Sequence, residues 1–97
     1  MIVEHVWILI IPGHQDAYEA AVREALPFLE SAPDCFGAEL RRQIEDPNRY
    51  LLMIKWASVE AHMAFRASTL FEQWRALTLP HYAQPSEATH FSEVLPR

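Results

Sequence analysis

The sequence predicts a single α+β domain whose strands and helices follow one another in the order βαββαβ. Three observations support this prediction. A chain of 97 residues is long enough for one hydrophobic core and too short for two. Its composition, 51% hydrophobic and 22% charged, is that of an ordinary globular protein and excludes a disordered chain. Four short apolar segments have the character of strands, and the segments between them show helical spacing.

The first strand is expected over Val3 to Ile11, because β-branched and aromatic residues fill this segment and Pro12-Gly13 ends it. Both faces of this strand are largely apolar, so we expect both to be covered. The first helix is expected from Asp16 to Ser31, with Asp16 as its N-cap. Pro27, late in this helix, is expected to kink it.

A hairpin is expected next. Cys35 to Ile44 and Tyr50 to Trp56 are the predicted second and third strands, with Pro47 in the turn between them. Proline suits the second position of a type I turn, because its ring fixes the backbone angle that this position needs. In the third strand, Tyr50, Leu52, Ile54 and Trp56 are expected to share one face.

Ser58 and Ser68 are the expected N-caps of two consecutive helices, and Thr89 to Leu95 is the expected last strand. This order is that of a ferredoxin-like fold, in which the helices cover one face of the sheet. Since the other face is also apolar, we expect a second copy to pack on it, sheet against sheet, as a homodimer. The predicted architecture is therefore a dimeric α/β barrel, with one ferredoxin-like domain over residues 1–97 of each chain.

The charge balance excludes several classes of partner. With 8 Lys and Arg against 13 Asp and Glu, the formal net charge is −5. This argues against nucleic acid and against an anionic membrane surface. No apolar run is long enough to span a bilayer, and no signal peptide is recognised at the N-terminus. The single cysteine, Cys35, cannot form an internal disulfide, which favours the cytoplasm.

Several segments resemble the antibiotic biosynthesis monooxygenase family, and together they extend over almost the whole chain. They are Cys35-Phe36-Gly37, Glu45 to Tyr50, Ile54 to His62, Phe65 to Ser68 with Phe71, and His90 to Val94. The resemblance implies a dimeric α/β barrel with a pocket between helices and sheet. Well-known members oxidise phenolic polyketides or quinols with molecular oxygen, without metal or flavin. Others degrade haem, but Val6, Phe65 and Arg75 stand where those members need asparagine, tryptophan and the axial histidine.

Four residues are candidates for acid–base chemistry. His62 and Arg66 are one helical turn apart, so a base at His62 and an anion-stabilising charge at Arg66 would share one helix face. The alternative is a surface histidine beside an arginine paired with a carboxylate. Glu4 interrupts an apolar strand; if its face lines the pocket, it would have a raised pKa and could pair with His62 or Arg66. If the strand has the other register, Glu4 is simply solvated. His90 on the last strand is a second acid–base candidate or a half-buried structural residue.

Aromatic residues are the candidates for substrate contacts, although at helical spacing such residues also form ordinary core. They are Trp7, Phe65, Phe71 and Trp74. No compact metal-ligand spacing occurs among the histidines, and no glycine-rich phosphate loop is present, so we expect neither a metal nor another cofactor. The sequence thus predicts a cofactor-independent monooxygenase for a small aromatic, quinol-type or polyketide-like substrate. The alternative is a non-oxidative dimeric binding protein, or an isomerase that uses the same pocket.

Overall fold

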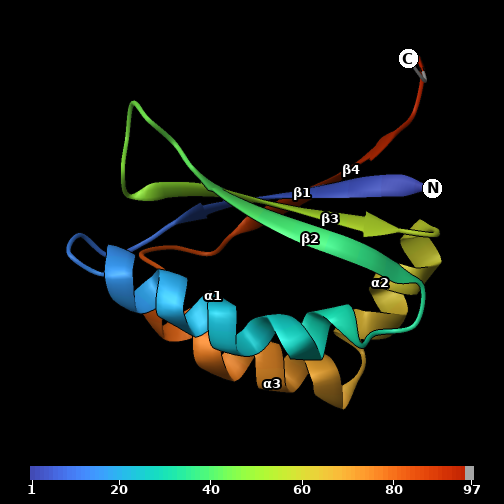
Figure 1. The fold of residues 1–97 in the computed structure, drawn as a ribbon, viewed down its shortest axis with the longest axis horizontal. Helices are drawn as coiled ribbons and strands as arrows, with labels where there is room; N and C mark the ends of the chain where they lie inside the picture. The colour runs from blue at the N-terminus through green and yellow to red at the C-terminus, as the bar shows by residue number, and fades with distance from the viewer. Residues whose placement is uncertain (96–97) are drawn as a thin grey trace.

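The computed structural model describes residues 1–95 and contains one four-stranded antiparallel sheet and three α-helices. Along the chain the elements are β1 (Ile2–Leu9), α1 (Gln15–Glu30), β2 (Cys35–Arg42), β3 (Arg49–Trp56), α2 (Val59–Arg66), α3 (Thr69–Thr78), a 3₁₀ turn η1 (Leu79–His81) and β4 (Glu87–Ser92). The strands lie in the order β2-β3-β1-β4, so β2 and β4 are the edges (Figure 1). The predicted ferredoxin-like βαββαβ fold is confirmed.

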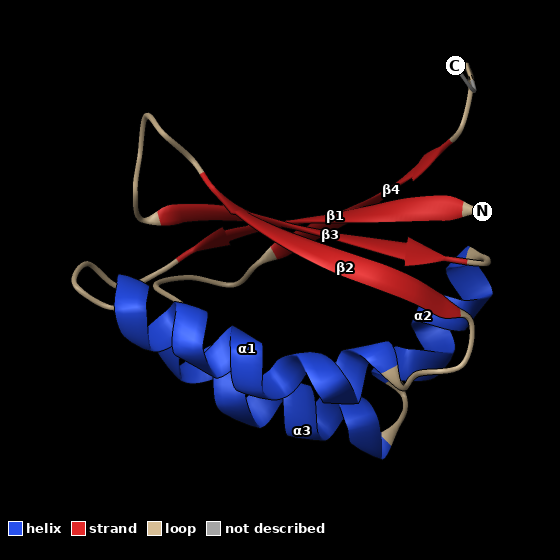
Figure 2. Ribbon diagram, in the orientation of Figure 1, coloured by secondary structure: helices blue, strands red, loops and turns tan. Residues whose placement is uncertain are grey.

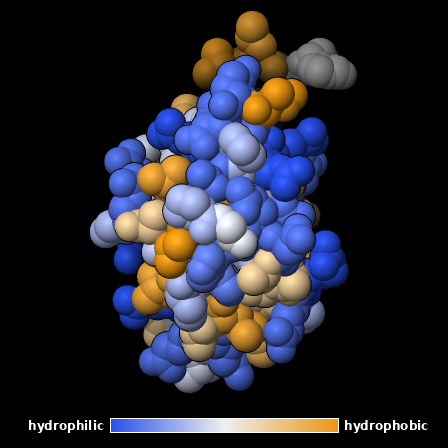
Figure 3. All heavy atoms as spheres, turned by 90° about the vertical axis from the view of Figure 1, so that its left-hand side faces the viewer, coloured by the Kyte–Doolittle hydropathy of each residue, from blue (hydrophilic) through white to orange (hydrophobic). Residues whose placement is uncertain are grey.

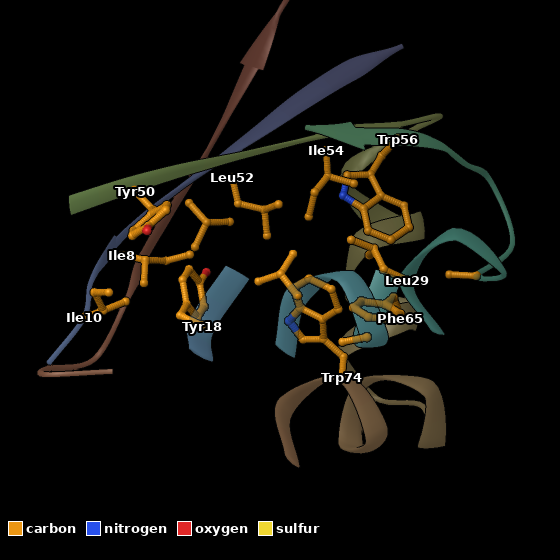
Figure 4. Close-up of a cluster of buried hydrophobic side chains, with 14 residues drawn as sticks. Ile8, Ile10, Tyr18, Leu29, Tyr50, Leu52, Ile54, Trp56, Phe65 and Trp74 are labelled. Atoms are coloured by element: carbon orange, nitrogen blue, oxygen red, sulfur yellow. The ribbon is translucent and has the colours of Figure 1, made fainter. Parts of the chain in front are cut away.

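All the helices lie on one side of the sheet, with α1 and α3 side by side below it (Figures 1 and 2). The core fills the space between these two layers. Every second residue of β1 and β3 points into this space, where it meets Tyr18 and Leu29 of α1 and Trp74 of α3 (Figure 4). The predicted shared face of Tyr50, Leu52, Ile54 and Trp56 is confirmed, because each of them is buried.

Antiparallel register decides which side chains become neighbours on the helix-covered face. On β1, Glu4 lies on that face with Val6 and Ile8, and it is buried. Its partner across the sheet is Ile54 of β3 on one side and His90 of β4 on the other. Side chains that are directly opposite in an antiparallel pair point to the same face. The register therefore brings Glu4 and His90 together under the helices.

Helix starts were predicted correctly for two of the three helices. Ser58 and Ser68 accept hydrogen bonds from the backbone N–H groups of Ala61 and Phe71 and cap α2 and α3. The prediction for Asp16 is wrong, because α1 begins at Gln15 and its N-cap position is His14, without a capping side chain. Asp16 lies instead in the first turn, where its charge is still favourable next to the helix dipole.

Pro47 acts as the local rules predict, the kink expected at Pro27 stays a prediction, and the ends of the strands differ slightly from expectation. Pro27 lies inside α1, which continues to Glu30. Pro47 stands in a tight turn closed by the Arg49 N–H, which donates to the Asp46 carbonyl at 2.9 Å. The last strand begins at Glu87 and ends at Ser92, earlier than predicted. Its final residue pairs with Ile2, where β1 itself begins, so no partner strand remains for a longer β4.

The face of the sheet that turns away from the helices is open and carries several exposed apolar side chains among polar ones. Phe36, Phe91 and Trp7 are 56%, 50% and 39% exposed on or beside it. A shallow hollow of about 770 Å³ lies there, and Val3 and Met53 contribute to its lining. Seen from the end of the molecule that carries the hairpin tip, the surface is mainly hydrophilic with separate hydrophobic patches (Figure 3). Among residues 1–95, no helix has the length and apolar character that a membrane span requires.

Candidate active site

A cavity of about 400 Å³ lies between the sheet and the helices α2 and α3. Its walls are mostly apolar, and a smaller number of polar and charged side chains stand among the apolar ones. The lining residues are Glu4, Val6, Leu29, Leu52, Ile54, His62, Phe65, Arg66, Phe71, Trp74, Arg75, Thr78, Leu79, Tyr82, Pro85, Ser86 and Ala88. This volume falls in the range of about 300–1,000 Å³ that is usual for small-molecule sites.

Four side chains from four different elements form a continuous polar chain at one wall of this cavity. The Trp56 Nε1–H of β3 donates to Glu4 Oε1 of β1 at 2.9 Å. The other carboxyl oxygen, Glu4 Oε2, lies 3.2 Å from His62 Nε2 of α2. His62 Nδ1 then lies 2.7 Å from Nε2 of His90 on β4. Both ring nitrogens of His62 are therefore engaged, one by a carboxyl group and one by a second imidazole.

The chain is deeply buried at its centre. Glu4 is 3% exposed and His62 is 5% exposed. The indole ring of Trp56 stacks on the imidazole of His62, with ring centroids 5.5 Å apart and planes 25° apart. Stacking on one side and hydrogen-bonding distances at both nitrogens hold the His62 ring in one orientation. A buried carboxyl group in such fixed surroundings is a candidate for proton transfer.

Burial shifts the pKa values of Glu4 and His62 in opposite directions, and each shift favours the neutral form of its group. It raises the pKa of Glu4, while the Trp56 hydrogen bond and the charge of Arg66 oppose this rise. Burial, together with the neighbouring His90 and the charge of Arg66, lowers the pKa of His62 to about 4. His62 is therefore an uncharged imidazole at neutral pH, with one N–H donor and one acceptor nitrogen.

The lowered pKa of His62 predicts a loss of folding stability in acid. The folded-state pKa of His62, about 4, lies below the ordinary value of 6.5, so the unfolded chain binds this proton first as the pH falls. The contribution of neutral His62 to the free energy of unfolding should be complete above pH 6.5 and should decrease by about 3 kcal/mol as the pH falls to about 4. Urea unfolding of wild type and His62→Asn across this range measures the difference. A difference that does not vary with pH would contradict the shift.

Arg66 places a positive charge at the rim of the cavity. It follows His62 by one turn of α2, and its guanidinium carbon lies 5.9 Å from the ring centroid of Phe71. The side chain is exposed, so it can move toward a bound anion. Its charge acts on both Glu4 and His62, as their pKa shifts show. The predicted neighbourhood of His62 and Arg66 is thus present in the structure.

Most of the sequence-predicted residues meet at this cavity. Glu4, His62, Arg66, Phe65, Phe71 and Trp74 all line it. His90 does not line it and reaches the site only through His62. Trp7 does not fit its predicted role, because odd-numbered residues of β1 point to the opposite face of the sheet. There the guanidinium of Arg49 lies 5.3 Å from the centre of the Trp7 ring.

Sequence reasoning missed the polar role of Trp56, which was expected only to share a strand face with Tyr50, Leu52 and Ile54. The residue is fully buried, and it also supplies the hydrogen bond that orients Glu4. A signal was available, since a buried indole N–H usually needs an acceptor. Tyr82 and Thr78, which follow or end α3, were also missed as lining residues. Within residues 1–95, no group of three or more His, Cys, Asp or Glu side chains is arranged to hold a metal ion.

The comparisons with known proteins agree with this fold and cavity. The family described as antibiotic biosynthesis monooxygenase matches residues 1–77. The chain belongs to the antibiotic biosynthesis monooxygenase family. The matched region includes Glu4, Trp56, His62 and Arg66, and it ends before the strand that carries His90.

Individual proteins resemble this chain along nearly its whole length. A crystal structure from Bordetella bronchiseptica, assigned to the same monooxygenases, is 40% identical over 97% of both chains, with a TM-score of 0.94. YczJ, an uncharacterized protein of Bacillus subtilis, is 28% identical over 97% of this chain and 100% of its own. SnoaB from Streptomyces nogalater, a cofactor-independent oxygenase, shares the fold with a TM-score of 0.80 and 19% identity, over 99% of this chain and 98% of its own.

Proposed function

We propose that this protein is a cofactor-independent monooxygenase that oxidises a small aromatic, quinol-type or polyketide-like molecule with molecular oxygen. The observation that supports this proposal best is the buried Glu4–His62 contact at the wall of a mostly apolar cavity, with Arg66 beside it. Membership of the family agrees with the same function, and the related fold of SnoaB belongs to a cofactor-independent oxygenase.

The first chemical task is to remove a proton from the substrate. His62 was the predicted base, but both of its ring nitrogens are engaged, and a neutral imidazole has only one acceptor lone pair. The oxygens of Glu4 are engaged as well, but each carboxylate oxygen keeps a second lone pair. We therefore assign the proton to the Glu4 carboxylate, with His62 holding that carboxylate in place. The guanidinium of Arg66 at the rim would stabilise the phenolate or enolate that remains, because opposite charges attract. The aromatic rings of Phe65, Phe71 and Trp74 would hold the flat substrate.

The oxygen chemistry would then be carried out by the substrate anion. The anion gives electrons to O₂ and forms a carbon–oxygen bond, which yields a peroxide on the substrate. The peroxide takes back a proton from Glu4, and the O–O bond breaks to leave a carbonyl and water. The two hydrogens lost by the substrate thus leave in that water molecule, and no outside reductant is needed. A cavity that excludes water protects the reactive anion.

Oxygen consumption tests the function directly. Purified protein mixed with a panel of hydroquinones and anthrones should consume O₂ faster than the same mixture without protein. The matched control is Arg66→Gln, which removes the charge and keeps a polar side chain of similar reach. We expect kcat/KM to fall by about 10²–10³-fold in this variant, as when one stabilising donor is removed. A panel on which wild type consumes no oxygen would count against oxygenase function.

A non-oxidative function is the second candidate. The Glu4–His62 pair and Arg66 would also suit proton transfer next to a carbonyl group, as in an isomerase, or the binding of an acidic aromatic ligand. Anaerobic assays separate these functions, because an isomerase needs no oxygen. His62→Ala separates catalysis from binding: an enzyme loses turnover, whereas a binding protein loses only affinity.

We also propose that the protein is a homodimer in which the open sheet face is covered by a second copy. The exposed Phe36, Phe91 and Trp7 support this proposal, because exposed apolar side chains grouped on one face, with polar residues around them, mark a protein–protein contact surface. Light scattering at micromolar concentration should give the mass of two chains. Met53→Glu, which puts a charge in that hollow, should give the mass of one chain. A monomeric wild type would contradict the proposal.

A further inference from the structure

The polar chain at the cavity leads outward to the edge of the sheet. From Glu4 Oε2 it passes to His62 Nε2 at 3.2 Å, and from His62 Nδ1 to His90 Nε2 at 2.7 Å. His90 lies on β4, an edge strand, and its side chain is partly exposed. Among residues 1–95, its remaining nitrogen, Nδ1, has no hydrogen-bond partner. The chain therefore begins at a buried carboxyl group and ends at a nitrogen near solvent.

The donors and acceptors of this chain can be arranged in two consistent ways. Trp56 Nε1 can only donate, so Glu4 Oε1 must accept from it in both arrangements. A neutral imidazole has one N–H and one acceptor nitrogen. His62 must therefore donate a hydrogen bond to one of its two neighbours, Glu4 or His90, and accept one from the other. With Glu4 ionised, both histidines carry their proton on Nε2. With Glu4 protonated, both carry it on Nδ1. The second arrangement holds one proton more than the first.

We infer that Glu4, His62 and His90 form a proton relay through which the carboxyl group in the cavity exchanges its proton with solvent at the edge of the sheet. In the outward direction, the Glu4 O–H proton passes to His62 Nε2, the His62 Nδ1 proton passes to His90 Nε2, and the His90 Nδ1 proton passes to water. One proton leaves, three bonds to hydrogen form and three break. The inward direction is the reverse.

The surroundings favour a relay in which no imidazolium accumulates. The charge of Arg66 faces both Glu4 and His62 from α2, and it disfavours a charged ring at His62. Tyr82 and Cys35 are the other titratable groups whose pKa values respond to Glu4, and burial raises the pKa of each, so both stay neutral. Since His62 can gain a proton at one nitrogen while it loses one at the other, the relay needs no charged intermediate.

The relay rests on the proposed function and adds to it. A bound substrate would seal Glu4 from the cavity side, and a carboxyl group that is protonated at that moment could not act as a base. The path through His62 and His90 allows Glu4 to lose that proton while the cavity is occupied. His90 would therefore act on catalysis without touching the substrate.

The relay can be tested without a substrate, by nitrogen NMR of the histidine rings in wild type and Glu4→Gln. In the variant, the amide oxygen must face the Trp56 N–H, so the amide N–H₂ must donate to His62 Nε2. Both His62 and His90 should then carry their proton on Nδ1. In wild type at alkaline pH, both should carry it on Nε2. His5, on the opposite face of β1, is the internal control. A His90 tautomer that is the same in both proteins would overturn the relay.

Activity gives the second test. His90→Ala should lower kcat by at least about 10-fold with little change in KM, and added imidazole should restore it. Pyrazole, which has a similar size and is a far weaker base, should not restore it. Full kcat in His90→Ala, or equal restoration by pyrazole, would overturn the relay. If wild type consumes no oxygen on any substrate, the proposed function is wrong, while the NMR comparison still decides whether the relay exists.

Discussion

Replacing Glu4 by glutamine is expected to lower kcat for quinol oxidation by about 10²–10⁴-fold, the usual contribution of a positioned acid or base. Glutamine has the same shape and can still accept the 2.9 Å hydrogen bond from Trp56 Nε1–H. It cannot take a proton from the substrate. The cavity keeps its size and its aromatic walls, so KM should change little. Oxygen uptake at saturating substrate measures the effect on kcat.

Glu19→Gln is the matched control for this substitution. Glu19 is a carboxylate that also accepts a hydrogen bond from an aromatic side chain, the hydroxyl of Tyr50, at 2.6 Å. It is partly buried between α1 and the sheet, where it also pairs with Arg42, and it does not line the cavity. Its substitution should leave kcat within about twofold of wild type, because the change lies away from the reacting groups. Equal losses in the two variants would show that the carboxyl at Glu4 has no special part in catalysis.

Replacing Trp56 by alanine should lower the free energy of unfolding by about 3–5 kcal/mol, as large-to-small changes of buried aromatic residues do. Trp56 is fully buried and contacts both His62 and Phe65 through its ring. Alanine would leave a void in the core and would also leave Glu4 Oε1 without its donor. Urea unfolding at one fixed protein concentration measures this loss, which should equal most of the stability of a small domain.

Trp56→Phe separates the two parts of this effect. Phenylalanine keeps most of the buried ring and removes only the N–H group. We expect a loss of about 1–3 kcal/mol, the cost of a buried polar group left without its partner. The pKa of Glu4 should rise further, because the lost hydrogen bond favoured the ionised form. A loss in the phenylalanine variant as large as in the alanine variant would contradict the importance of ring packing.

Local sequence rules predicted most of the fold. Serine caps, a proline turn and strand alternation each act over a few residues, and Ser58, Ser68 and Pro47 behave as those rules state. The N-cap of α1 was predicted at Asp16 and lies at His14, two residues earlier. An acidic residue is favourable both at the N-cap and within the first turn, so Asp16 alone does not fix the start. The homodimer remains a prediction, since a single chain does not show what covers its open face.

The site was less predictable, because its geometry depends on contacts between residues far apart in the chain. Glu4 was expected on either face of β1 with nearly equal weight, and only the register with β3 and β4 places it under the helices. The same register moves Trp7 to the other face. His62 was identified correctly as a cavity residue, but nothing local to α2 shows that its two nitrogens meet Glu4 and His90.

The position of His90 on an edge strand has a consequence for hydrogen exchange. Within residues 1–95, β4 is bonded only to β1, whereas β1 and β3 each have a partner strand on both sides. Strands held on one side open more readily than the centre of a sheet, so amide protons of β4 should exchange well before those of β1. During such local openings His90 would leave His62, while Glu4 and Trp56 stay packed. The connection of the buried carboxyl group to solvent would thus be interrupted by fraying at the edge of the sheet, without unfolding of the core.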